Sequence, residues 1–281
     1  MSALGPRATL GAMAAVAELE LRRMLAGPRP LVLGGLTLAV AALGFVVRRF
    51  APDPGVPEAW GWLYLLLLTF LFLQTVVILV PLLHSSGLVR DELEEGTLVY
   101  LFTRPLPKPL LFVAKLAAAS GLSAAIVVGG MLAFHLAFAL AAGGAPAGVG
   151  VTTHLLPFLA AGALGVLGYG ALFAFLGLLT RRGLILGIVY GFVSELLLAN
   201  IPAVVRQLTL MHYLRSVALS RAGAGAPDDE GGLRDALGLL DLVPPGQATL
   251  TVLALAGVCV GLSLVAVSRI EFGGGAQTEG D

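Results

Sequence analysis

Six long and nearly uncharged apolar segments restrict the fold of this chain more than any other feature of its sequence. We expect them at residues 30–47, 62–88, 110–142, 155–180, 184–205 and 248–268. A helix of about 20 apolar residues crosses the hydrocarbon core of a bilayer and satisfies its own backbone hydrogen bonds there. The sequence therefore predicts an all-α fold, a polytopic membrane bundle of six transmembrane helices.

The composition supports a membrane protein and argues against a nucleic-acid partner. Hydrophobic residues make up 58% of the 281 residues, charged residues make up 12%, and the mean hydropathy is +0.95. Soluble domains are about 45–50% apolar and about 25% charged. Because the formal net charge is +0, no global field attracts nucleic acid, and we expect the lipid bilayer as the surrounding medium.

An amphipathic helix is expected to precede the bundle, within a cytoplasmic interfacial segment at residues 1–29. Its apolar positions recur at helical spacing, which is typical of a helix that lies in the membrane interface. The apolar stripe comprises Leu10, Met13, Ala14, Ala17, Leu21 and Met24, and other faces carry Glu18, Glu20, Arg22 and Arg23. The alternative is that this segment extends the first span.

The remaining boundaries follow from breaks in hydropathy. The transmembrane domain is expected at residues 30–268, with a polar segment at 206–247 that forms two short extracellular helices around an acidic loop. An ordinary loop is the alternative, and it predicts helices without a buried face. Residues 269–281 are rich in glycine and polar residues, which predicts a disordered tail.

Positive charge predicts the orientation, because cytoplasmic loops are enriched in Lys and Arg. With the N-terminus inside, 11 of the 17 Lys and Arg residues fall on the cytoplasmic side. We therefore expect a multi-pass protein of the cell (inner or plasma) membrane with both termini in the cytoplasm. The polar interruption at residues 89–109 then also faces the cytoplasm.

No catalytic or cofactor-binding pattern occurs in the sequence. The two lysines, Lys108 and Lys115, do not follow a GxxxxG run, so the chain has no phosphate-binding loop. HExxH, GxSxG and paired-cysteine motifs are also lacking. We expect a protein that is not an enzyme, with no catalytic residues, no metal and no cofactor of its own.

The segment at residues 89–109 is the strongest positive signal for a partner. Its acidic start, Arg90–Glu95, would continue the second span into water as a charged turn. Thr97 can then cap a short helix, whose apolar face would consist of Leu98, Leu101 and Phe102. Such a helix suits a groove on another protein. The alternative is a solvated loop.

Three further features within the spans each allow two interpretations. Glu195 could line a translocation path, or it could form a structural hydrogen bond with Tyr190 or Ser194. His135 and Met131, together with Met211 and His212, could bind a soft metal, or His135 could be a satisfied core histidine. The repeat Gly183, Gly187 and Gly191 could bring helices close together, or it could reflect the general glycine content.

The stretch RDELEEGTLVYLFTRPLPKPLLFVAK resembles the signature of type-2 ATP-binding-cassette (ABC) permeases, including exporters and multicopper-enzyme maturation permeases. The matching positions are Glu92, Glu94 or Glu95, Gly96, Thr97, Leu98, Leu101, Pro105 and Lys115. Val99 departs from the signature, which commonly has an acidic or polar residue there. AELELRRMLAGPRPLVL is similar to the interfacial helix of the same family, and SELLLANIPAVVRQLTLMHYLRSVA to its fifth span and outer segment.

The resemblance implies that Gly96–Phe102 is a coupling helix that docks on a separate ATPase subunit, where ATP binds. The ATPase-coupling residues would be Glu92, Glu94, Glu95, Gly96, Thr97, Leu98, Leu101, Phe102 and Arg104. The family architecture implies two permease chains, as a homodimer or a heterodimer, with two ATPases. The acidic run would meet basic residues on the ATPase or on the interfacial helix of the permease itself.

These observations lead to a principal functional hypothesis and two alternatives. The principal one is the permease subunit of an ATP-driven ABC transporter, an exporter. One alternative is a membrane assembly or scaffold subunit that uses the same docking helix without moving a solute. The other is a secondary transporter driven by an ion gradient, with Glu195 as its ion site.

Overall fold

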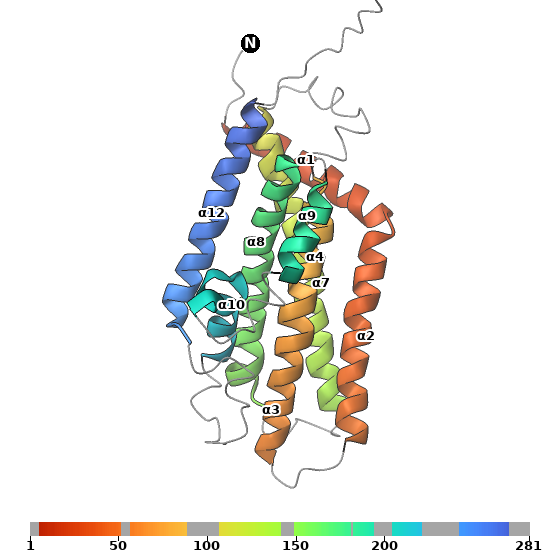
Figure 1. Cartoon of the computed structure of the whole chain (residues 1–281). Coiled ribbons are helices and arrows are strands. Elements are labelled where there is room, and N and C mark those ends of the chain that lie inside the picture. The colour runs from red at the N-terminus through yellow and green to blue at the C-terminus, as the bar shows by residue number, and fades with distance from the viewer. Residues whose placement is uncertain are drawn as a thin grey trace, which may run out of the picture.

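The computed structural model describes residues 6–51, 57–88, 107–141, 149–180, 182–193, 204–220 and 242–269. Every regular element within these ranges is a helix, and five helical segments are long and apolar enough to cross a membrane. Figure 1 shows them side by side in an elongated bundle. The prediction of an all-α, polytopic membrane bundle is therefore confirmed.

The helices follow one another along the chain with few non-helical residues inside the described ranges. Their bounds are α1 Pro6–Ala26, α2 Arg29–Phe50, α3 Pro57–Leu67, the π-helical η1 Leu68–Val76, α4 Val77–Ser85, α7 Lys108–Ala141, the π-helical η2 Val151–Leu155, α8 Leu156–Leu179, α9 Gly183–Tyr190, the 3-10 helix η5 Val204–Leu208, α10 Leu210–Leu219 and α12 Pro245–Arg269. The segments α3, η1 and α4 form one continuous span, and η2 continues into α8.

The described spans start a few residues earlier than hydropathy predicts. Prolines lie in the first turns of α2, α7, α8 and α12, where their missing N–H groups are not needed by the helix. The start predicted for the span at 155–180 is too late, because Val151–Leu155 is already helical. For the span expected at 184–205, the apolar helix Gly183–Val193 is described, and 194–203 lie outside the described residues. The count of six spans stays a prediction.

Helix α1 lies across one end of the bundle, the end at which α12 finishes (Figure 1). Its inner face packs on the start of α7, where Val16 forms a cluster with Leu111 and Ala114. Leu10 of the predicted apolar stripe is 66% exposed, as a residue that faces lipid would be, whereas Glu20 is 8% exposed. The location of α1 in the membrane interface stays a prediction. The buried face of α1 is thus the one that fits α7, and it includes a charged residue.

Aromatic residues fill the interior of the bundle. Tyr64, Phe72, Phe134 and Phe138 are buried, and their ring centroids lie 5.3–6.1 Å apart in four contacting pairs. Aromatic pairs in such tilted, edge-on and stacked arrangements add about 0.5–1.5 kcal/mol each beyond area burial. These contacts join α3 and η1 to α7 and make one continuous core.

The glycines at positions 183, 187 and 191 lie at close contacts between helices. Of the two interpretations of their spacing, the structure therefore favours close helix packing over general glycine content. A Cβ at Gly183 would collide with the Cα of Gly177 in α8, and one at Gly187 would collide with Leu82 in α4. At Gly191 the added atom would come within 3.2 Å of Ile78. Small residues at four-residue spacing therefore let α9 approach α4 and α8.

Helix α10 confirms the first of the two helices expected in the segment 206–247. Thr209 caps it by accepting a hydrogen bond from the backbone N–H of His212 at 3.4 Å. Leu210, Met211 and Leu214 are buried in contacts with the main core, so the helix has the buried face that an ordinary loop would lack. The second expected helix lies outside the described residues.

Candidate functional site

The predicted coupling residues lie outside the described part of the chain, and so does Glu195. They are Glu92, Glu94, Glu95, Gly96, Thr97, Leu98, Leu101, Phe102 and Arg104. Their roles stay predictions. The structure does describe the two places where the chain leaves the bundle before this segment and enters it again.

The residues that follow α4, just before the polar segment, are packed tightly against the bundle. Leu88 is buried in a cluster with Phe112 of α7, Ala174 of α8 and Val267 of α12. The backbone of Ser86 lies so close to α8 that a Cβ at Gly177 would collide with its carbonyl oxygen. The residues that precede the polar segment are thus fixed against three other helices.

The return to the bundle is fixed against α1. The carbonyl of Pro107 accepts hydrogen bonds from the backbone N–H groups of Leu110 and Leu111 at 3.0 and 3.2 Å, which starts α7. Leu111 then packs on Val16 in the middle of α1, while Met24 near the C-terminal end of α1 packs on the cluster around Leu88. The described residues on either side of the polar segment therefore pack close to α1.

A buried ion pair joins α1 to α7 at this end of the bundle. Lys115 Nζ lies 3.3 Å from Glu20 Oε2, and the two side chains are 1% and 10% exposed. A buried charge is expensive unless it is paired, so each residue stabilises the other. The sequence matched Lys115 to the permease signature and placed Glu20 on a face other than the apolar stripe, but it did not indicate that the two side chains pair.

A second polar contact inside the bundle links α10 to the π-helical segment η1. Arg215 Nη2 donates a hydrogen bond of 2.9 Å to Gln74 Oε1, and the guanidinium lies 5.6 Å from the centre of the Phe70 ring. Both polar side chains are buried. The sequence analysis missed this pair because 141 positions separate the two residues. The signal in the sequence that could have indicated a buried polar contact was Gln74, a polar residue among apolar neighbours.

A shallow groove between α4 and α9 lies beside this contact. It has a volume of about 180 Å³, and its lining is apolar apart from Gln74 and Thr75 of η1. Tyr190, the other candidate path residue, is half-buried, and its ring meets the Phe173 ring edge-on at 6.4 Å. The predicted pairing of Tyr190 with Glu195 stays untested.

His135 has the environment of a core histidine. Its Nδ1 atom lies 3.0 Å from Tyr64 Oη, within hydrogen-bond distance, and the two rings meet edge-on. Met131, one turn away, packs on Gly162 of α8, where a Cβ would come within 2.9 Å of its methyl group. Within the described ranges, no three His, Cys, Asp or Glu side chains gather as a metal site would require.

The helical bundle, together with helix α1 packed across one of its ends, defines the class of protein. It is a multi-pass helical membrane protein with an N-terminal helix across the end of the bundle. Residues 30–197, more than half of the chain, match the family described as ABC-2 family transporter protein. The chain therefore belongs to the ABC-2 transporter family. The match includes the polar segment and its two fixed ends. A comparison with curated proteins finds no match.

Proposed function

We propose that this chain is the membrane-spanning permease subunit of an ATP-driven exporter, and that a separate subunit hydrolyses the ATP. The observation that carries the proposal is the match to the ABC-2 transporter family across residues 30–197. It is supported by the location of the polar segment, which leaves and re-enters the bundle beside α1. In this assignment the α1 end faces the cytoplasm.

The fixed ends of the polar segment provide the path for force from the ATPase. A force that the ATPase applies to residues 96–102 is transmitted to α4 through Leu88 and to α7 through Leu111. Leu88 and Leu111 can transmit it because each is packed against other helices. The ion pair between Glu20 and Lys115 makes α1 move together with α7. The ATPase thus acts on α1, α4 and α7 as one unit.

Movement of α4 relative to α9 is the step that we associate with transport. These helices contact at Gly187 and Gly191 and border the groove with Gln74 and Thr75. The π-helical η1 lies between α3 and α4, and π-helical turns within helices frequently occur at functional sites. The candidate residues of the translocation path are Tyr190, the last residue of α9, and Glu195, which follows it in the sequence. Transport by alternating exposure requires a second permease chain, identical or different.

The test is charge reversal in the acidic run, Glu94→Lys with Glu95→Lys. We expect the variant to insert normally and to lose stimulation of the co-purified ATPase in proteoliposomes, because the docking surface changes sign. Asp228→Lys with Asp229→Lys is the matched control, since it makes the same charge change in the acidic loop of the 206–247 segment. The control should keep full stimulation.

Three results would contradict the proposal. Unchanged ATPase stimulation in the Glu94/Glu95 variant would remove the coupling assignment. An associated ATPase without any ATP-dependent flux would favour the assembly or scaffold function. Flux that follows a proton gradient without an ATPase, and that is lost in Glu195→Gln, would favour a secondary transporter.

A further inference from the structure

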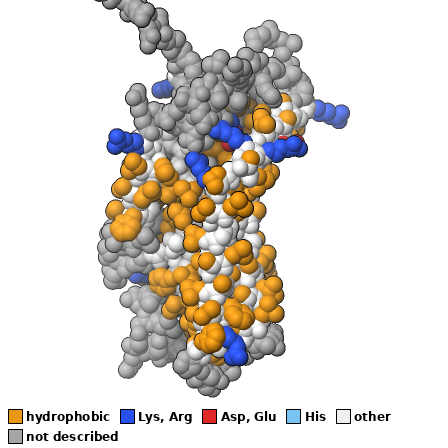
Figure 2. Space-filling view, turned by 90° about the vertical axis from the view of Figure 1, so that its right-hand side faces the viewer, with side chains coloured by type: hydrophobic (Ala, Val, Ile, Leu, Met, Phe, Trp, Pro, Cys, Tyr) orange, Lys and Arg blue, Asp and Glu red, His pale blue; other side chains and the backbone are white. Residues whose placement is uncertain are grey.

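The π-helical segment η1 lies at the centre of the second span, where a continuous α-helix would be expected. It occupies Leu68–Val76 in a helical stretch that runs from Ala59 to Ser85. Figure 2 shows that the surface between the charged ends of the molecule is mainly hydrophobic on the face drawn, as in a membrane-embedded bundle. Because water is scarce at this depth, an irregular helix must satisfy its polar groups with protein partners. The partners of η1 therefore determine what this segment can do.

Two contacts of η1 reach back five residues instead of the four of an α-helix. The backbone N–H of Val77 donates to the carbonyl of Phe72, and Thr75 Oγ1 donates to the carbonyl of Phe70 at 3.2 Å. A wide turn of this kind holds about one residue more than an α-helical turn. The residues that follow it are consequently placed about one position earlier around the helix axis than in a continuous α-helix.

Arg215 of α10 holds this wide turn from outside the span. Its Nη2 atom donates a hydrogen bond of 2.9 Å to Gln74 Oε1, and its guanidinium lies 5.6 Å from the centre of the Phe70 ring. Gln74 and Arg215 are both buried. Because both contacts are made to η1, the guanidinium fixes the spacing of Phe70 and Gln74 within the wide turn. A hydrogen bond from a charged donor is stronger than one between neutral groups.

Helix α4, which follows η1, is built in a way that permits a change of register. Pro81 lies inside α4 and has no N–H, so the bond that an α-helix would form to the carbonyl of Val77 is not available. On its α9 side, Leu82 packs against Gly187, which has no side chain. Few interlocking atoms therefore oppose a rotation of α4 against α9.

The wide turn decides which side of α4 faces the end of α9. A Cβ at Gly191 would come within 3.2 Å of Ile78, whereas a Cβ at Gly165 of α8 would collide with Val77. Ile78 thus faces Gly191, and Val77 faces α8. Each α-helical residue turns the helix by about 100° and advances it by about 1.5 Å. If η1 loses its extra residue position, Val77 takes the place of Ile78 opposite Gly191.

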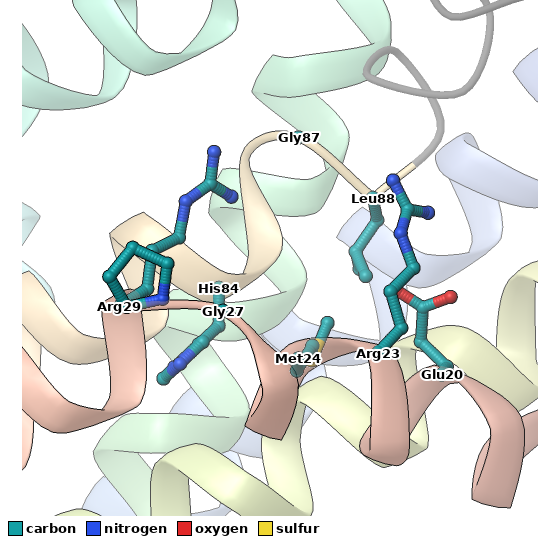
Figure 3. A pocket seen from close by; sticks show the side chains of 9 residues that line it. Glu20, Arg23, Met24, Gly27, Arg29, His84, Gly87 and Leu88 are labelled. Carbon is teal, nitrogen blue, oxygen red and sulfur yellow. The ribbon is translucent and has the colours of Figure 1, made fainter.

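We propose that Arg215 is a positioning residue that keeps η1 π-helical, and that its release lets η1 become α-helical and shifts α4 by one residue against α9. The shift would also move the end of the span. Figure 3 shows this end, where His84 and the Gly87–Leu88 turn lie beside Met24 and Gly27. The register itself does not rest on the proposed function. Its use in transport does, because there the movement of α4 against α9 is the transport step.

Disulfide cross-linking of the purified full-length chain in nanodiscs measures the register. Cys259, the only cysteine of the chain, is first removed by Cys259→Ala. The first reporter combines Ile78→Cys with Gly191→Cys, and the second combines Val77→Cys with Gly191→Cys. The first should link faster than the second. In Arg215→Met the ratio of the two initial rates should fall about 10- to 100-fold, because a hydrogen bond to a charged group is lost.

Thr75→Val is a milder variant, because it removes only the hydroxyl that donates to the carbonyl of Phe70. It should lower the same ratio about 2- to 10-fold. The matched control is Thr251→Val on α12. The hydroxyl of Thr251 donates to the carbonyl of Gln247 at 3.0 Å, four residues back in an ordinary α-helix, so this variant should leave the ratio unchanged.

Deletion of Leu71 provides a rescue, because it removes the extra residue from η1. Combined with Arg215→Met, the deletion should restore the faster linking of the first reporter, a result that loss of stability alone would not produce. A third reporter, Thr37→Cys with Gly130→Cys, checks the fold. It joins α2 to α7, where a Cβ at Gly130 would lie 2.9 Å from Thr37, and it should link equally in every variant.

Two results would overturn the proposal. One is an unchanged ratio in Arg215→Met while the third reporter still links, and the other is the failure of the deletion to restore the ratio. If Arg215→Met also loses the third reporter, Thr75→Val decides, and an unchanged ratio in that variant overturns the proposal. No ATPase takes part in these measurements, so a failure here leaves the proposed transport function standing.

Discussion

The ion pair between Glu20 and Lys115 should contribute far more to stability than the exposed ion pair between Arg22 and Glu18 of the same helix. At 3.3 Å and an effective dielectric constant of about 20, two unit charges attract each other by about 5 kcal/mol. Removal of one partner from a buried pair typically costs about 3–5 kcal/mol, because the other charge stays buried. We therefore expect Glu20→Gln, and equally Lys115→Met, to destabilise the protein by about 3–5 kcal/mol.

Helix α1 supplies its own control for this prediction. Arg22 and Glu18 form an ion pair at 2.6 Å, shorter than the buried one, but their side chains are 76% and 62% exposed. Exposed pairs one helical turn apart contribute about 0.3–0.5 kcal/mol. The Glu18→Gln variant should thus be nearly as stable as the wild type, although it breaks the shorter contact.

A double-mutant cycle measures the interaction itself. The free energy of unfolding is determined in mixed micelles for the wild type, Glu20→Met, Lys115→Met and the double variant. Because the double variant leaves neither charge of this pair buried without the other, it should recover most of the loss seen in either single variant. Hydrogen exchange of the α1 amides reports whether the helix detaches from α7 before the bundle unfolds. Additive losses in the cycle, or a loss in Glu18→Gln as large as in Glu20→Gln, would refute the reasoning.

Three other substitutions test contacts within the bundle. Gly187→Ala should destabilise the protein by about 1–3 kcal/mol through overpacking against α4, whereas Gly257→Ala, which faces open space on α12, should cause no loss in thermal unfolding. Gln74→Leu removes a hydrogen bond from the charged Arg215 and should cost about 1.5–3 kcal/mol, and faster hydrogen exchange in α10 would locate the effect. Tyr64→Phe should cost about 0.5–1.5 kcal/mol in the same unfolding assay through loss of its contact with a histidine, and an unchanged stability would contradict that assignment.

The spans could be predicted closely because the signal for them is local. A run of apolar residues such as 110–142 spans a membrane whatever surrounds it, and the observed helix Lys108–Ala141 differs by one or two residues at each end. The helix α10 was also predictable, since Leu214 and Ala218 mark a face at helical spacing and both are buried. Hydropathy and periodicity depend only on neighbours in the sequence.

The buried face of α1 could not be predicted in the same way. The spacing of apolar residues marks a stripe that includes Leu10, which is exposed, and it gives no sign that Glu20 is buried against Lys115. Which face of an amphipathic helix is buried depends on the partner surface. Lys115, far away in the sequence, makes a carboxylate favourable at a buried position that the apolar stripe does not include.

The sequence by itself determined the class of fold, the approximate spans and the family, because apolar length and a contiguous motif are properties of adjacent residues. It also marked Gly183, Gly187 and Gly191 as candidates for close packing. Tertiary structure alone decided that Glu20 pairs with Lys115, that Arg215 reaches Gln74 and that two arginines border one cavity at the elbow. Buried charges and polar groups are stable only where a partner is within a few ångströms, and such partners come from distant parts of the chain.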